Sequence, residues 1–235
     1  MNRRTKGRIA VCHAVCRIFD SFGLQLPYGV RRLAEIVEEL EQKFPCNRAH
    51  SDRVVEYAKA IVAELPIPDD NVATICHAAC LHDVGKIGIP GEILRKPGPL
   101  TARERDIVRN HPRVAADLLR CLLYPEECIE LIYYHHEWFN GHGYPCRAGG
   151  KSIPLGARVI AVADAFDAMT SDRPYRQAMT IDEASRELQD CAGSQFDPEV
   201  VEALTRAYEK GALVSQRNHQ DRIVHDRYSW TRRSR

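Results

Sequence analysis

The chain has 235 residues, of which 44% are hydrophobic and 28% are charged, and its formal net charge is +1. This composition is ordinary for a globular protein, and so small a net charge argues against a surface for nucleic acid polymers. Nine cysteines, an odd number without a CxxC pair, indicate reduced thiols in a cytoplasmic protein and exclude a disulfide framework as the basis of the fold.

The chain begins with a segment, residues 1–44, that we expect to form an N-terminal helical extension of two helices. Its apolar stretch is interrupted by His13, Arg17 and Asp20, so we expect neither a signal peptide nor a membrane span. The main domain is expected over residues 45–213. A polar, basic C-terminal tail is expected over residues 214–235.

Helical periodicity runs through nearly all of residues 45–213. Apolar residues recur at three- and four-residue steps over 52–65, and an Ala- and Cys-rich stretch over 72–84 predicts a buried helix that ends at Gly85. Later helices are expected to open, in chain order, near Thr101, Pro112, Pro125, Pro154, Thr180 and Asp197, with the last two ending at Gly193 and Gly211. Thr101 and Thr180 each begin a capping box. No alternating strand pattern is present, so the predicted fold class is all-α.

Two short segments concentrate side chains that bind metals. The first is His82-Asp83, with Lys86 one turn beyond, and the second runs over 135–145, from two adjacent histidines into a Gly-rich loop that ends in Pro145. Adjacent ligands on a helix diverge by about 100°, so His82 and Asp83 can contact two neighbouring ions. Imidazole and carboxylate together suit Fe, Mn, Co, Ni or Zn better than Mg or Ca.

The candidate ligands lie on or at the ends of separate expected helices, and a helical bundle can direct such side chains to one point. They are His50, His82, Asp83, His111, His135, His136 and Asp164. Asp83 is the expected bridge between ions, because a carboxylate has two oxygens to share. Lys86 is expected to hold a phosphate oxygen. Two close metal ions would activate a water and neutralise a phosphodiester, which favours hydrolysis of a phosphate ester.

Two acidic residues beside these motifs keep alternative interpretations. Asp167 follows Asp164 by three residues, and it is either a rival ligand or a capping or pairing residue. Glu137 either accepts a hydrogen bond from a ligating imidazole or faces solvent.

Together these residues resemble the HD-GYP family of the HD phosphohydrolase superfamily. The matching pieces are residues 82–90, 111–112, 135–145, 153–158 with Asp164, and 172–176. The similarity extends from about residue 50 to about residue 201, which is most of the chain. The order and number of matching motifs make the resemblance highly specific.

The resemblance implies an HD-type helical bundle around a multinuclear metal site, with 45–213 as the HD-GYP catalytic domain. It implies a phosphodiesterase of bacterial signalling that converts cyclic di-GMP to the linear dinucleotide, with or without further hydrolysis to GMP. The implied metal ligands are the seven candidates above, and Asp83 and Lys86 are the implied catalytic residues. The implied substrate-binding residues are Gly143, Tyr144, Arg173 and Arg176.

Two positions depart from the family pattern. Members with a third metal have a Glu four residues before the first His, and here that residue is Cys46. We therefore expect two transition-metal ions, iron or manganese before zinc, nickel or cobalt. Cys146-Arg147 also replaces the small or acidic residues that follow the loop in the family.

Two alternatives to cyclic di-GMP hydrolysis remain. One is a phosphohydrolase acting on another nucleotide, including a mixed cyclic dinucleotide. The other is a catalytically silent module that binds a diguanylate cyclase or another partner, and its expected mark is the loss of metal ligands.

Overall fold

The computed structural model describes residues 35–37, 39, 47–172 and 177–213. The described residues form helices joined by turns and contain no strand, which confirms the all-α prediction. The helices are α3 (Asn47–Val62), α4 (Asp69–Leu81), the 3₁₀ helix η1 (Val84–Gly88), α5 (Gly91–Leu94), α6 (Ala102–Arg109), α7 (His111–Cys121), α8 (Glu126–Tyr134), η2 (Gly150–Ser152), α9 (Leu155–Thr170), α10 (Ile181–Asp190) and α11 (Pro198–Glu209). The expected tail over 214–235 and nearly all of the expected extension over 1–44 lie outside the described residues.

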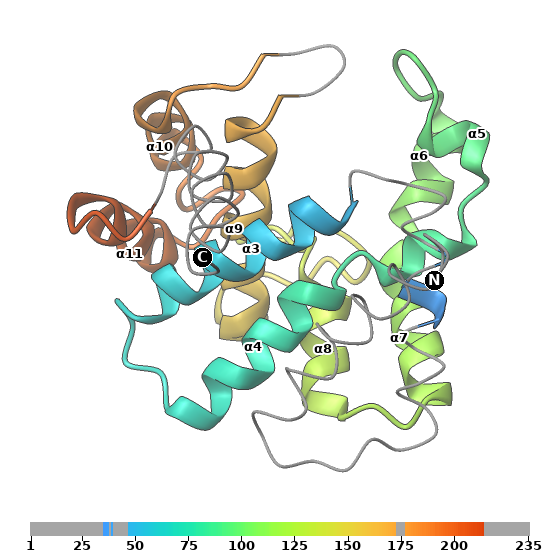
Figure 1. Ribbon diagram of the computed structural model, residues 1–235, viewed down its shortest axis with the longest axis horizontal. Helices are drawn as coiled ribbons and strands as arrows, with labels where there is room; N and C mark the ends of the chain where they lie inside the picture. Colours follow the sequence, from blue (N-terminus) through green and yellow to red (C-terminus); the bar gives the residue numbers. More distant parts are fainter. Residues whose placement is uncertain (1–34, 38, 40–46, 173–176, 214–235) are drawn as a thin grey trace, which may run out of the picture.

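The core is built around α9, which is the most apolar of the long helices. α3 packs against α4 and α9, while α8 packs against α4, α7 and α9. Figure 1 shows α6 and α7 at one end of the molecule and α10 and α11 at the other, with the remaining long helices between them. The Tyr57 ring of α3 meets the buried Phe166 ring of α9 edge-on, with 4.9 Å between centroids. The helices between the two ends therefore form one continuous core.

The predicted helix starts are confirmed where a local cap sets them. Thr101 and Thr180 both form complete capping boxes, with Glu104 and Glu183 as their partners. α11 begins after Asp197, whose side chain accepts a hydrogen bond from the backbone N–H of Glu199. These starts depend on residues only a few positions apart, so the sequence alone specifies them.

The predicted helix ends over 52–65 and 72–84 are wrong by three residues. α3 ends at Val62 and α4 ends at Leu81, so that His82 and Asp83 lie in the turn before η1. Gly85 does not end a helix. A Cβ on Gly85 would lie 2.0 Å from the backbone oxygen of His111, so the glycine is what allows η1 to lie directly against α7.

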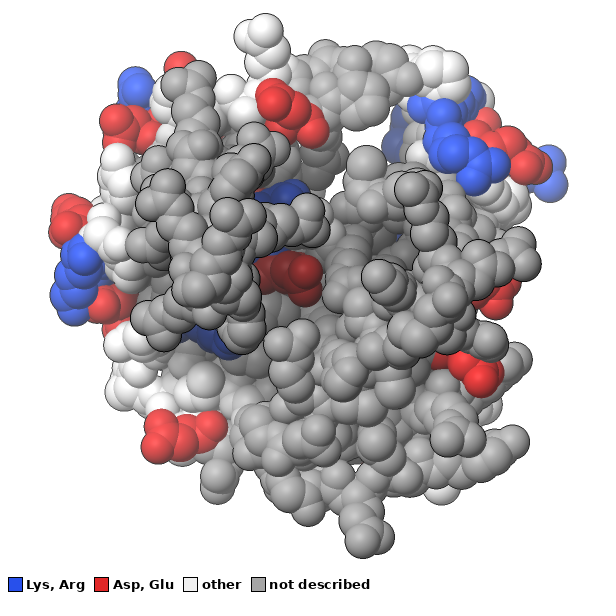
Figure 2. Space-filling model, in the orientation of Figure 1, with Lys and Arg blue, Asp and Glu red and all other residues white. Residues whose placement is uncertain are grey.

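Charges on the surface are mixed in sign. Figure 2 shows acidic and basic side chains interspersed over the described part of one face, without a broad patch of either sign. This distribution agrees with a net charge of +1. Among the described helices, none combines the length and the apolar character that crossing a bilayer requires. None of the described cysteines forms a disulfide.

Candidate metal centre

Five parts of the fold bring the seven predicted ligands together. α3 carries His50, the turn after α4 carries His82 and Asp83, and α7 begins with His111. His135 and His136 directly follow α8, and Asp164 lies on α9. The ligand atoms form two groups, each with all its atoms within 4.8 Å of one another: His50, His82 and Asp83 in the first, and His111, His135 and His136 in the second.

Three of the imidazoles are oriented by the backbone at a helix end. Each ring Nδ1–H donates to the carbonyl three residues earlier: His82 to Ala79 at 2.6 Å, His111 to Val108 at 2.8 Å and His135 to Ile132 at 2.6 Å. These carbonyls belong to the last turns of α4, α6 and α8, where the helix no longer supplies the N–H group four residues on. Because a carbonyl can only accept, Nδ1 carries the proton in all three rings. The neutral ring then keeps a lone pair on Nε2.

Within each group, two of the Nε2 atoms face each other. The Nε2 atoms of His50 and His82 are 3.3 Å apart, and those of His111 and His135 are 3.4 Å apart. At this distance two ring nitrogens repel each other unless a proton or a metal cation lies between them. The donor set of imidazole and carboxylate, aimed in this way, fits transition-metal ions.

Asp83 lies between the two groups. Its Oδ2 is 3.5 Å from Nε2 of His82, and its Oδ1 is 3.6 Å from Nε2 of His111. The residue is 2% exposed, and Nζ of Lys86 donates to Oδ2 at 2.6 Å. Burial alone would raise the pKa of Asp83, but Lys86 and His82 hold it well below its usual range. An ionised carboxylate with one oxygen toward each group has the placement of a bridge.

The electrostatics of the two groups differ. Burial lowers the pKa of His111 to about 4, and burial with neighbouring imidazoles holds the pKa values of His135 and His136 well below their usual range. These rings are therefore neutral, as metal ligands must be. Burial opposes the charge on His82 as well, but the Asp83 carboxylate raises the pKa of His82 to about 9. Without a metal ion the His82 ring therefore carries a second proton on Nε2, and a metal ion that binds there would take the place of that proton.

Asp164 and Asp167 take different places beside His50. Oδ1 of Asp164 lies 3.3 Å from Nε2 of His50, on the side where the lone pairs meet. Asp167 is buried and accepts the Nδ1–H of the same ring at 2.7 Å. The guanidinium of Arg53 holds Asp167 in turn, with Nε to Oδ1 at 2.5 Å and Nη2 to Oδ2 at 3.0 Å. Asp164 thus has a ligand's position. Asp167 orients a ligand, because its hydrogen bond fixes the direction of the His50 ring.

The loop after His136 folds back over the centre. The backbone N–H of Tyr144 donates to the carbonyl of His136 at 3.2 Å. Gly143 is packed so closely that a Cβ would lie 2.2 Å from the backbone nitrogen of Trp138. Glu137 is 3% exposed and accepts the backbone N–H of Cys146, so the solvent-facing interpretation of Glu137 is wrong. The observed partner of Glu137 is thus the loop backbone at Cys146 and not an imidazole.

Tyr144 is the loop residue that contacts the candidate ligands. Its ring lies 4.8 Å from the His136 ring, tilted by 30°. The guanidinium carbon of Arg109 lies 5.4 Å from the centroid of the Tyr144 ring. Burial, together with the charges of Asp164 and Asp83, raises the pKa of Tyr144, so its hydroxyl keeps its proton. Sequence reasoning missed Arg109 and Arg53, although both lie two or three residues from a predicted ligand.

Three residues of sequence-based interest lie outside the described part of the chain: Cys46, Arg173 and Arg176. The role of Cys46 in metal number and the substrate contacts of the two arginines therefore stay predictions.

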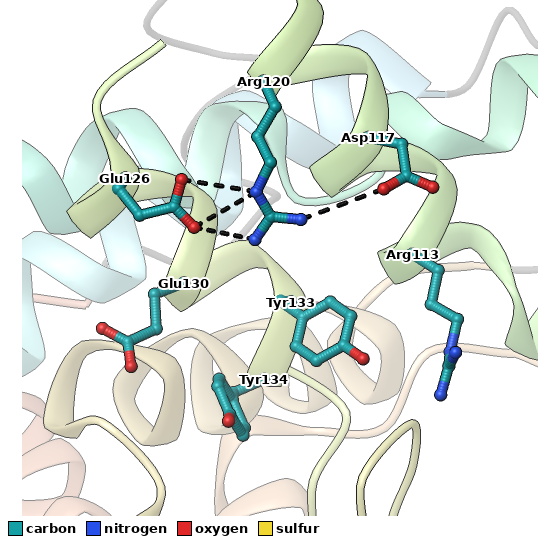
Figure 3. A pocket seen from close by; sticks show the side chains of 7 residues that line it. All are labelled: Arg113, Asp117, Arg120, Glu126, Glu130, Tyr133 and Tyr134. Atoms are coloured by element: carbon teal, nitrogen blue, oxygen red, sulfur yellow. Dashed lines mark hydrogen bonds and ion pairs between the residues drawn. The ribbon is translucent and has the colours of Figure 1, made fainter.

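A separate groove of about 540 Å³ lies between α7 and α8 (Figure 3). Its lining residues are Arg113, Asp117, Arg120, Glu126, Glu130, Tyr133 and Tyr134. Arg120 is bound to Glu126 at 2.7 Å and lies 3.8 Å from Asp117. None of the lining residues is a candidate ligand, so the groove is distinct from the metal centre.

Comparison with known proteins agrees with this geometry. The model of the family described as HD domain matches residues 35–200. The chain belongs to the HD domain family. A solved structure with the same HD fold, Bd1817, an HDG"Y"P protein from Bdellovibrio bacteriovorus, aligns with a TM-score of 0.59 at 19% identity over 69% of this chain and 52% of that one.

Curated relatives of this HD domain are phosphodiesterases of cyclic dinucleotides. The cyclic di-GMP phosphodiesterase response regulator RpfG of Xanthomonas campestris is 38% identical over 74% of this chain and 47% of its own length. A cyclic di-GMP phosphodiesterase of Thermotoga maritima is 37% identical over 75% and 49%. The 3'3'-cGAMP-specific phosphodiesterase 3 of Vibrio cholerae is 37% identical over 72% and 36%. The matched region thus spans half or less of each relative.

Proposed function

We propose that this chain is an HD-GYP-type, metal-dependent phosphodiesterase that hydrolyses cyclic di-GMP to the linear dinucleotide, with GMP as the product of a second hydrolysis. The observation that carries the proposal is the pair of imidazole groups joined by Asp83, beside a loop that retains Gly143, Tyr144 and Pro145. The names of the relatives in Xanthomonas and Thermotoga support cyclic di-GMP as the substrate. A reduced-thiol protein of this kind would work in the bacterial cytoplasm.

The proposed cofactors are two transition-metal ions, iron or manganese before zinc, nickel or cobalt. One ion would be held by His50, His82, Asp83 and Asp164, and the other by Asp83, His111, His135 and His136. Such ions supply a water of lowered pKa and neutralise the oxygens of a phosphodiester.

The remaining roles fall to side chains around the ions. Asp83 would bind both ions, because each of its oxygens faces a different group. Lys86 donates one of its three N–H bonds to Asp83, which leaves two for a phosphate oxygen. Tyr144 offers its ring and a protonated hydroxyl beside His136, and Gly143 lets the loop lie close to the centre. Arg173 and Arg176 are proposed to contact the substrate from the segment after α9.

A substrate panel tests the proposal. Protein purified without oxygen and loaded with Mn²⁺ or Fe²⁺ is assayed with cyclic di-GMP, 3'3'-cGAMP, cyclic di-AMP and GMP, and the products are separated by chromatography. We expect cyclic di-GMP to give the highest kcat/KM and linear dinucleotide to appear first. Hydrolysis of GMP alone would refute the proposal.

The second candidate substrate is 3'3'-cGAMP, because a relative named for it is 37% identical to this chain. A kcat/KM for 3'3'-cGAMP above that for cyclic di-GMP would select it. The silent, partner-binding alternative is not favoured, because every predicted ligand is present and gathered in the described centre.

A further inference from the structure

Arg109 is an exposed cation that lies beside the candidate centre without being part of it. It is the last residue of α6, two residues before His111. Its guanidinium lies over the Tyr144 ring, and that ring contacts His136. Arg109 is thus connected to the metal centre through a single intervening side chain.

Within the described ranges, the charge of Arg109 has no carboxylate partner. Among the described residues, no carboxylate lies within ion-pair distance of it, whereas Arg53 and Lys86 are bound to Asp167 and Asp83. A contact between an exposed guanidinium and a tyrosine face is weak, and it is not a hydrogen bond. The N–H groups around the edge of the guanidinium remain available to a ligand.

A cyclic dinucleotide presents a second phosphate that needs such a cation. One phosphate must sit at the metal centre to be hydrolysed, and the other is held in the same ring at a fixed distance from it. Lys86 is bound to Asp83 at the centre, so its charge lies beside the place of the phosphate that is hydrolysed. An arginine fork binds two phosphate oxygens at once, and stacking on an aromatic ring pre-orients it.

We propose that Arg109, held over Tyr144, is a substrate-positioning residue that binds the phosphate of the cyclic dinucleotide that is not being hydrolysed. The inference rests on the proposed function, because it needs a substrate with two phosphates. It assigns to α6 a role in substrate recognition that the sequence motifs leave unassigned.

The test compares Arg109→Ala, Arg109→Lys and the control Arg103→Ala. Arg103 is an exposed arginine of the same helix that has no contact with Tyr144 or a candidate ligand in the described part of the chain. Each metal-loaded protein is assayed with cyclic di-GMP, 3'3'-cGAMP and bis(p-nitrophenyl) phosphate, which has only one phosphate. Metal content is measured on the same samples.

We expect Arg109→Ala to raise KM for its cyclic dinucleotide by about 10- to 100-fold, the usual effect of losing a charged hydrogen bond. Its activity on bis(p-nitrophenyl) phosphate, its kcat and its metal content should match the parent protein. The KM of Arg109→Lys should lie between those of the parent and Arg109→Ala, because lysine keeps the charge but loses the planar group that binds two oxygens. The KM of the control Arg103→Ala should match that of the parent.

Three results would overturn the inference. Unchanged KM in Arg109→Ala would show that the guanidinium does not touch substrate. A parallel loss on both substrate types, or a loss of metal, would show that Arg109 only supports the loop or the centre. A parent protein that cleaves bis(p-nitrophenyl) phosphate but no cyclic dinucleotide would refute the proposed function itself, which is a distinct outcome from an unaffected variant.

Discussion

Single residues at the centre carry unequal shares of its chemistry. Each histidine directs one nitrogen into one group, whereas Asp83 directs one oxygen toward each of the two groups. Lys86 is attached to the same carboxylate at 2.6 Å, so its charge acts both on Asp83 and on whatever anion approaches it. Substitutions at these two positions should therefore separate metal binding from phosphate binding.

Replacing Asp83 with Ala should abolish turnover more completely than replacing any one histidine. The change removes the carboxylate that, in the described part of the chain, faces both sets of imidazoles, together with its negative charge. We expect turnover to fall by more than ~10³-fold, beyond the usual cost of losing one electrostatic contact. Steady-state kinetics and elemental analysis check this, and near-normal turnover with full metal content would rule out the bridging role.

Replacing Lys86 with Ala should lower turnover by ~10²–10³-fold, the usual range for one preorganised charge in an active site. Metal content should stay near that of the parent, because Lys86 contacts the carboxylate and not the imidazoles. The measurement pairs kcat with metal stoichiometry. If kinetics and metal content both remained unchanged, Lys86 would be a partly exposed lysine without a catalytic role.

At the scale of helices, α3 and α9 hold one corner of the centre by matched spacing. His50 and Arg53 lie three residues apart on α3, and Asp164 and Asp167 lie three apart on α9. Residues at this spacing share a helix face, and the two helices pack against each other. The result is a connected set in which His50 meets both carboxylates and Arg53 holds the deeper one.

Replacing Asp167 with Ala should weaken metal binding by about 10- to 100-fold, as loss of a carboxylate behind a ligating histidine does. Without it, the His50 ring loses the acceptor that fixes its Nδ1 proton. Titration with Mn²⁺ measures the affinity, and Asp190→Ala at the exposed end of α10 is the control. An Asp167→Ala protein that bound metal as tightly as the control would show that His50 needs no such support.

The difference between local patterns and contacts across the chain explains what the sequence could and could not predict. The capping boxes and the choice of candidate ligands could be read from the sequence, because His82-Asp83, the histidine pair and the Thr-x-x-Glu caps are each local patterns. The partner of Arg53 was not, since Asp167 lies 114 residues away in the chain. The end of α4 was misplaced for a similar reason. Gly85 is required by the close approach of the α7 backbone, and no local sequence pattern reveals that contact.

At the scale of the whole molecule, the centre ties together distant parts of the chain. Its candidate ligands range from residue 50 to residue 164 and lie on α3, α7 and α9 and in the turns after α4 and α8. The ring nitrogens that face each other at 3.3 and 3.4 Å make the ligand set costly to assemble unless a proton or a metal ion lies between them. Metal binding and folding are therefore expected to be linked.

We expect at least two transition-metal ions per chain and a clear loss of thermal stability on chelation. An ion present at 1,000 times its Kd stabilises the folded state by about 4 kcal/mol. Elemental analysis and thermal unfolding, with and without chelator, provide the measurements. Binding of one ion or fewer after anaerobic reconstitution, or a Tm indifferent to chelator, would contradict the expectation.

The backbone acceptors of His82, His111 and His135 give these rings a robustness to mutation that His50 lacks. Every amino acid brings a carbonyl, so substituting the residue three positions before each ring leaves the acceptor in place. His50 relies on a carboxylate side chain, which a single codon change removes. In a lineage released from selection, the ion at His50 should be lost first, and the group of three histidines at the start of α7 and the end of α8 should outlast it.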